Sequence, residues 1–165
     1  MPAHDDARPA SSDASGREPG AGADGAAGRE TIEAHPAVAG ETASRVAFTG
    51  EAVALLRSLW EIHGPLMFHQ SGGCCDGSSP MCFPAGEFRT GAADVLLGEL
   101  DLPDGRGAVL GRIGFWMSRE QFEYWKHTHL TVDVVDGRGS GFSVEAPEGK
   151  RFLIRSVLMQ DPAGS

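Results

Sequence analysis

All three cysteines of the chain lie in one short stretch, and this stretch holds most of the residues that could carry chemistry. Cys74, Cys75 and Cys82 are accompanied there by the glycines at 72, 73 and 77. Thiolates are soft ligands that suit Zn, Cu(I), Fe and iron–sulfur clusters. Glycine lets the backbone turn sharply around a bound ion. The stretch therefore predicts a site for a thiophilic metal or an iron–sulfur cluster.

The spacing of the thiols differs from the Cys-x-x-Cys of zinc ribbons and thioredoxin motifs. Adjacent side chains diverge in most backbone conformations, so Cys74 and Cys75 are a poor pair for one metal. The expected ligands are one of these two together with Cys82, and His69 or Asp76 as a third. The alternative for the thiols is a structural role, because free cysteine is often a small buried hydrophobe.

One thiolate could instead attack an electrophile directly. A nucleophilic cysteine is normally activated by a base, and no histidine–carboxylate pair can be picked out beside the thiols in the sequence. His127 and His129 follow a predicted helix end, where a dipole interaction explains a histidine without any site. We therefore expect a binding protein rather than an enzyme. The remaining alternatives are a thiol enzyme and a module that only binds another protein.

The composition limits the partners and the compartment. The chain has 165 residues and a formal net charge of −9, so it lacks the basic surface that binding to nucleic acid requires. No apolar run reaches the length of a membrane helix. No secretory signal is visible at the N-terminus, and an odd, clustered set of cysteines is typical of reduced thiols. The sequence therefore predicts a cytoplasmic protein.

Two tails are predicted to flank one domain. Residues 1–45 contain no Leu, Phe, Trp, Tyr or Cys, so they cannot bury enough apolar surface to offset the entropy of ordering them. They are predicted to be disordered. Residues 46–160 are predicted to form a single compact domain, followed by a short tail at 161–165.

The domain is predicted to be α+β. A first helix is expected to begin after Thr49 and to end at Gly64, with Leu55, Leu56, Leu59 and Ile62 on one face. A second begins at Ser118, which forms a capping box with Gln121. The predicted strands cover residues 66–70, 95–100, 109–117, 130–135, 142–145 and 151–159. This order predicts two helices packed on a mixed, largely antiparallel sheet.

The run from Phe68 to Ser78 resembles a small bacterial family catalogued as domain of unknown function 779. The runs 115–118 and 141–145 and the Tyr124-Trp125 pair also fit this family, so the resemblance covers roughly residues 47–160. Genes of the family often lie beside aldehyde dehydrogenase genes. The resemblance therefore implies a role accessory to aldehyde or alcohol oxidation, with an aldehyde dehydrogenase as partner. It implies no established activity.

The order of elements is also similar to that of the A-type iron–sulfur carrier domains, also called HesB-like. In these carriers a glycine–cysteine pair follows the strand that leaves the first helix, and Gly73-Cys74 matches it. The carriers take two further thiols from a Cys-x-Cys near the C-terminus, where this chain has none. The resemblance implies a HesB-like arrangement of the fold, with Cys74 as the one matched position.

Overall fold

The structure is a computed structural model that describes residues 30–70, 80–137 and 143–159. Every helix and strand described below belongs to the unit Thr31–Ser165. Three of the predicted site residues, Cys74, Cys75 and Asp76, lie outside the described residues. Residues 1–29 of the tail predicted at 1–45 and the predicted tail at 161–165 also lie outside them.

Two sheets form the framework of this unit. In the first sheet the strands follow the order β1 (Thr31–Glu33), β3 (Val46–Thr49), β8 (Thr128–Asp136) and β9 (Lys150–Leu158). In the second they follow the order β2 (His35–Pro36), β6 (Asp94–Pro103), β7 (Val109–Ser118), β4 (Leu66–Gln70) and β5 (Met81–Pro84). Among the strands of the described residues, only β3 with β8 and β4 with β7 pair in parallel. The predicted α+β class and largely antiparallel pairing are confirmed, with the strands divided between two sheets.

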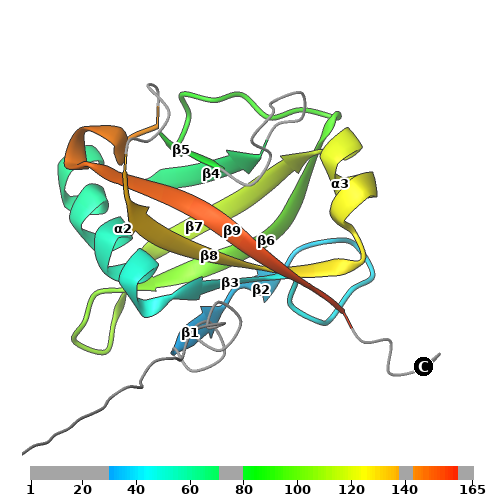
Figure 1. The fold of residues 1–165 in the computed structure, drawn as a ribbon, viewed down its shortest axis with the longest axis horizontal. Coiled ribbons are helices and arrows are strands. Elements are labelled where there is room, and N and C mark those ends of the chain that lie inside the picture. The colour runs from blue at the N-terminus through cyan, green and yellow to red at the C-terminus, as the bar shows by residue number, and fades with distance from the viewer. Residues whose placement is uncertain (1–29, 71–79, 138–142, 160–165) are drawn as a thin grey trace, which may run out of the picture. The chain divides into compact units, whose positions relative to one another are not determined.

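The core lies between the two sheets, with β8 and β9 in front of β4, β6 and β7 in Figure 1. Its centre is Phe68 on β4, whose ring makes an edge contact with Phe152 of β9 at 5.0 Å between centroids. Phe48 and Phe115 pack against the same ring at 5.8 and 5.7 Å. All four side chains are fully buried, and each such burial is worth roughly 1.5–3 kcal/mol.

The first helix, α2 (Gly50–His63), confirms the predicted boundaries. The Thr49 hydroxyl accepts a hydrogen bond from the Ala52 amide at 3.1 Å, and Gly64 ends the helix with a φ of 79°, which favours glycine. Ala52, Leu56 and Leu59 are buried, whereas Ile62 is exposed and not part of the packed face. The helix leads from β3 of the first sheet to β4 of the second, so it places β4 and the cysteines that follow it.

The second helix, α3 (Arg119–Trp125), begins where the capping box predicted. The Ser118 hydroxyl accepts a hydrogen bond from the Gln121 amide at 3.2 Å. Phe122 and Trp125 pack against the core. The two helices lie at opposite ends of the two layers (Figure 1). Among the described residues, no helix is long and apolar enough to cross a membrane.

The structure begins before the predicted domain boundary at residue 46. β1 pairs with β3, β2 pairs with β6, and Ala34 between them is only 2% exposed. These strands fall within the segment predicted to be disordered. Their pairing depends on backbone hydrogen bonds and a small buried alanine, and a search for large apolar side chains cannot detect either feature. Paired strands are therefore present from Thr31 onward, within the tail predicted at residues 1–45.

The strand predicted at 142–145 is not formed at residues 143–145. These residues make a turn that leads into a short 3-10 helix, η1 (Ala146–Glu148). Pro147 lies in its first turn, and Gly149 ends it in the left-handed region with a φ of 73°. Ser143 and Glu145 are buried, and both make hydrogen bonds to groups outside the turn. Val144 between them is buried as well, so the three residues do not alternate between two faces as a strand would.

Candidate functional site

A histidine–carboxylate pair, formed by a buried histidine and a partly buried aspartate, lies at the end of β4. His69 is the penultimate residue of that strand, and Asp94 is the first residue of β6. The His69 Nε2 and Asp94 Oδ1 atoms are 2.7 Å apart, and the two side chains are 3% and 14% exposed. The second carboxylate oxygen accepts a hydrogen bond from the Gly91 amide at 2.9 Å. Asp94 is therefore held from both sides.

The electrostatics of the pair indicate which atoms carry protons. The hydrogen bond from His69 is the largest cause that lowers the pKa of Asp94, and it outweighs the opposing effect of burial. An ionised carboxylate only accepts hydrogen bonds, so Nε2 of His69 is the donor. In the neutral ring the lone pair then lies on Nδ1. This arrangement suits both a general base and a metal ligand.

Aromatic rings surround the imidazole. The Phe88 ring lies against it at 4.2 Å between centroids, and Phe83 stacks on Phe88 at 5.1 Å. In the register of the second sheet, His69 stands between Met81 of β5 and Trp116 of β7. Because Phe68 points into the core, its neighbour His69 faces the opposite side of the sheet. The pair is thus largely shielded from water without being part of the main core.

Cys82 lies on the other face of that sheet. It is directly opposite Phe68 in the β4–β5 register, and its side chain belongs to the fully buried core. Burial raises the pKa of its thiol well above the usual range, and the nearby Glu145 raises it further. The structure therefore does not bring Cys82 together with His69. The prediction treated Cys82 as a loop residue, whereas it belongs to β5, where the strand alternation turns it inward.

Cys82 is also the point where the connection between β8 and β9 contacts β5. Its amide donates to the Ser143 hydroxyl at 2.8 Å, and its carbonyl accepts from the Val144 amide at 2.9 Å. The Ser143 hydroxyl donates to Glu145, whose other carboxylate oxygen is 3.4 Å from the Phe152 amide. Burial is the largest cause that raises the pKa of Glu145. Sequence analysis gave Ser143 and Glu145 no role.

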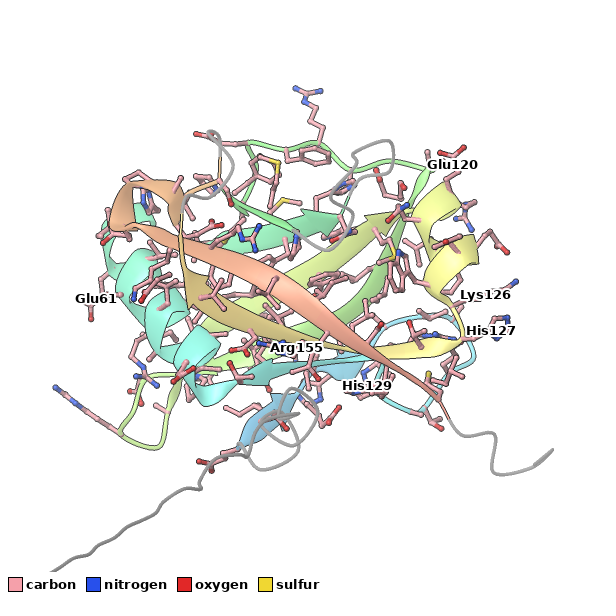
Figure 2. All side chains as sticks on the ribbon, in the orientation of Figure 1. Glu61, Glu120, Lys126, His127, His129 and Arg155 are labelled. Atoms are coloured by element: carbon pink, nitrogen blue, oxygen red, sulfur yellow. The ribbon has the colours of Figure 1, made fainter. Side chains whose placement is uncertain are left out.

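Two further histidines, His127 and His129, were considered from the sequence, and their positions are explained by the fold. Figure 2 shows His127 and His129 near the end of the layers where α3 and the start of β8 lie. His129 makes a 2.9 Å contact with Glu33 of β1, so it helps to hold that strand. His127 lies just beyond the end of α3 at Trp125, close to the helix end predicted from the sequence.

Within residues 30–70, 80–137 and 143–159, no group of three or more His, Cys, Asp or Glu side chains is arranged to hold a metal ion. The described residues place His69 and Cys82 apart, and they bring His69 together with Asp94, which the sequence analysis missed. No local signal links these two residues, because they are 25 positions apart and lie on strands separated by β7.

Comparison with known proteins identifies a family but no characterised relative. Neither the curated proteins nor the solved structures contain a significant match. The model of the family described as "Domain of unknown function (DUF779)" matches residues 55–158, from α2 to the end of β9. This match covers more than half of the chain, and the protein therefore belongs to that family.

Proposed function

We propose that this protein handles a small electrophile through one thiol of the Cys74–Cys75 pair, with His69 and Asp94 as its acid–base partners. The observation that carries the proposal is the 2.7 Å contact between the buried His69 at the end of β4 and the partly buried Asp94 at the start of β6. A base oriented by a carboxylate is the arrangement that activates a nucleophile. The chain reaches Cys74 five residues after His69, a path of at most about 18 Å.

The proposed step requires no external oxidant or reductant. The thiol proton passes to the His69 imidazole while Asp94 stabilises the resulting imidazolium. The thiolate sulfur attacks the carbonyl carbon of an aldehyde, and the carbonyl π electrons move to oxygen. The imidazolium then returns the proton to that oxygen, which gives a hemithioacetal. A role accessory to aldehyde oxidation, with an aldehyde dehydrogenase as partner, is consistent with this step and forms part of the proposal.

The position of Cys82 favours this reading over the metal site expected from the sequence. That site needed Cys82 as the second thiol, and Cys82 is a buried core residue with a raised pKa. Without it the thiol ligands are the adjacent Cys74 and Cys75, a poor pair for one metal. The sequence-level objection to thiol chemistry was the lack of a histidine–carboxylate pair, and His69 with Asp94 supplies one.

A metal site remains the second candidate, and the same pair supports it. Histidines that bind metals commonly donate their other ring nitrogen to a carboxylate, as His69 does to Asp94. The ligands would then be Cys74, Cys75, Asp76 and His69, holding Zn, Cu(I), Fe or an iron–sulfur centre. Reduced thiols in either role suit the cytoplasm. The third candidate is a module that binds a dehydrogenase without using its cysteines.

Alkylation kinetics separate the candidates. Each Cys→Ser variant is treated with iodoacetamide at pH 7 under anaerobic conditions, alongside His69→Gln and a control, His129→Gln, at a surface contact. We expect one of Cys74→Ser and Cys75→Ser to abolish fast alkylation, Cys82→Ser to leave it intact, and His69→Gln alone of the histidine variants to slow it.

Anaerobic titration with Zn(II), Cu(I) and Fe(II) completes the comparison. A Kd below about 10 µM, or roughly −7 kcal/mol, that is lost in His69→Gln would favour the metal site. Slow alkylation of every cysteine together with no metal binding would contradict both candidates and leave the interaction module.

A further inference from the structure

The β8–β9 connection is fastened to the edge strand β5 by a small set of buried groups, which we call the Glu145 latch: Cys82, Ser143, Val144, Glu145 and Phe152. The Cys82 amide and carbonyl bind the Ser143 hydroxyl and the Val144 amide at 2.8 and 2.9 Å. Ser143 in turn donates to Glu145. The latch therefore joins the two sheets at a place where their strands do not pair.

The latch contains a carboxyl group in an interior position. Glu145 is 1% exposed and Ser143 is 2% exposed, and Cys82 and Phe152 are fully buried. The titratable group that faces Glu145 from β5 is the Cys82 thiol, and β9 contributes the uncharged Phe152 amide. Among the described residues, no cationic side chain is a cause of its pKa shift. With respect to the described residues, an ionised carboxylate here would be a buried charge that no cation stabilises, which is costly.

We propose that Glu145 is a proton-sensitive latch that fastens the β8–β9 connection to β5 when protonated and releases it when ionised. The hydrogen bonds from Ser143 and Phe152 lower the pKa of Glu145, but burial raises it by more, so the neutral carboxyl is the form that fits the interior. The ionised carboxylate is relieved by moving into water, which breaks both bonds and removes Ser143 from the Cys82 amide. Burial raises the pKa of Glu145 in the folded protein. The latch is therefore stable below the ordinary pKa of a glutamate, and it is lost as the pH rises through the folded value.

The latch bears on the site through the chain. β5 begins at Met81, six residues after Cys75, and it pairs with β4, which carries His69. The protonation state of Glu145 thus controls how firmly the strand after the Cys74–Cys75 pair is held. This regulatory role rests on the proposed function, whereas the latch itself does not.

Amide hydrogen exchange tests the latch directly. Protection of the Cys82 and Val144 amides is measured by NMR at pH 5.5 and pH 8 in the wild type, in Glu145→Gln and in a control, Glu148→Gln, at the nearby end of η1. The Phe115 amide at the centre of the second sheet reports global stability and normalises the values. At pH 5.5 we expect the same protection in the wild type and in Glu145→Gln. At pH 8 the wild type should lose at least tenfold more protection than Glu145→Gln. Glu148→Gln should follow the wild type.

A Cys82-to-Phe115 ratio of protection that is the same at both pH values in the wild type would overturn the latch. If Glu145→Gln does not fold, the wild type alone decides: the Cys82-to-Phe115 ratio must fall across the titration of the Glu145 carboxyl, followed by ¹³C NMR, and a constant ratio overturns the proposal. Alkylation by iodoacetamide at pH 8 tests the regulatory part. The alkylation rates of the wild type and Glu145→Gln are expected to differ at least threefold. Equal rates, with the latch confirmed by hydrogen exchange, would overturn only the regulatory role. Loss of all fast alkylation with an intact latch would instead contradict the proposed function.

Discussion

A single methyl group added at Gly98 tests whether the segment before residue 46 belongs to the domain. Gly98 lies on β6 opposite Pro36 of β2. A Cβ atom there would lie 2.8 Å from the His35 carbonyl oxygen and 3.2 Å from both Ala34 Cβ and Val46 Cγ1. The first of these contacts involves backbone, so it can be relieved only if the segment carrying β2 moves away from β6.

The expected cost follows from this geometry. Overpacking by one or a few methyl groups in a packed region costs typically about 1–3 kcal/mol. For a domain of this size, each kcal/mol corresponds to roughly 4 °C in Tm. Gly98→Ala is therefore expected to lower Tm by about 4–12 °C. Gly91→Ala is the matched control, because a Cβ at Gly91 meets nothing within 4 Å and its φ is outside the left-handed region.

The assay combines urea unfolding with hydrogen exchange. The Ala34 amide donates to the Val46 carbonyl at 2.9 Å, and the Ala37 amide donates to the Leu97 carbonyl at 3.3 Å. Gly98→Ala should reduce the protection of these two amides at least tenfold more than that of the Phe115 amide. A stable Gly98→Ala variant with unchanged protection at Ala34 and Ala37 would show that residues 31–37 are not packed as described, and would refute the reasoning.

The other predictions concern stability. Deletion of residues 1–45 should lower the free energy of unfolding by more than about 2 kcal/mol, since it removes β1, β2 and the Arg45–Glu41 ion pair. An unchanged urea midpoint would instead support a domain that begins at residue 46. Ser118→Ala should cost roughly 0.5–2 kcal/mol by urea unfolding, because it removes the cap of α3, and no loss would move the helix boundary. Asp133→Ala should cost roughly 1–3 kcal/mol, as it removes partners of Thr49 and Arg155, and a neutral result would mean that this buried carboxylate adds no net stability. The lowered pKa of Asp94 contributes stability that is present above its unfolded pKa and lost as the pH falls through the folded value. The urea midpoint of the wild type should therefore fall in acid, below about pH 4, and it should fall less steeply in Asp94→Asn. Identical slopes in the two proteins would contradict the lowered pKa of Asp94.

The elements set by local chemistry could be predicted from the sequence. Thr49 and Gly64 define α2 because a cap and a left-handed glycine act on residues three or four positions away. Ser118 and Gln121 start α3 for the same reason. The strand predicted at 130–135 likewise lies within β8, where Leu130 and Val132 are core residues.

The division into two sheets and the site pair could not be predicted in this way. β1 and β2 are strands because β3 and β6 offer free edges, which no property of residues 31–36 reveals. His69 meets Asp94 across β7, so their contact depends on the register of three strands. The burial of Cys82 follows from its pairing with Phe68, and treating the cysteines as one loop concealed that pairing.

The pH dependence of alkylation in the wild type and in Asp94→Asn tests the central claim most directly. A thiol without a partner titrates near pH 8.5. If His69 and Asp94 serve a thiol of the Cys74–Cys75 pair, the rate of reaction with iodoacetamide should rise with a midpoint at least about one pH unit below that value in the wild type. Asp94→Asn, checked for an unchanged circular dichroism spectrum, should shift the midpoint upward and slow the reaction at pH 7 about tenfold or more. Midpoints near pH 8.5 in both proteins, with equal rates at pH 7, would contradict the account.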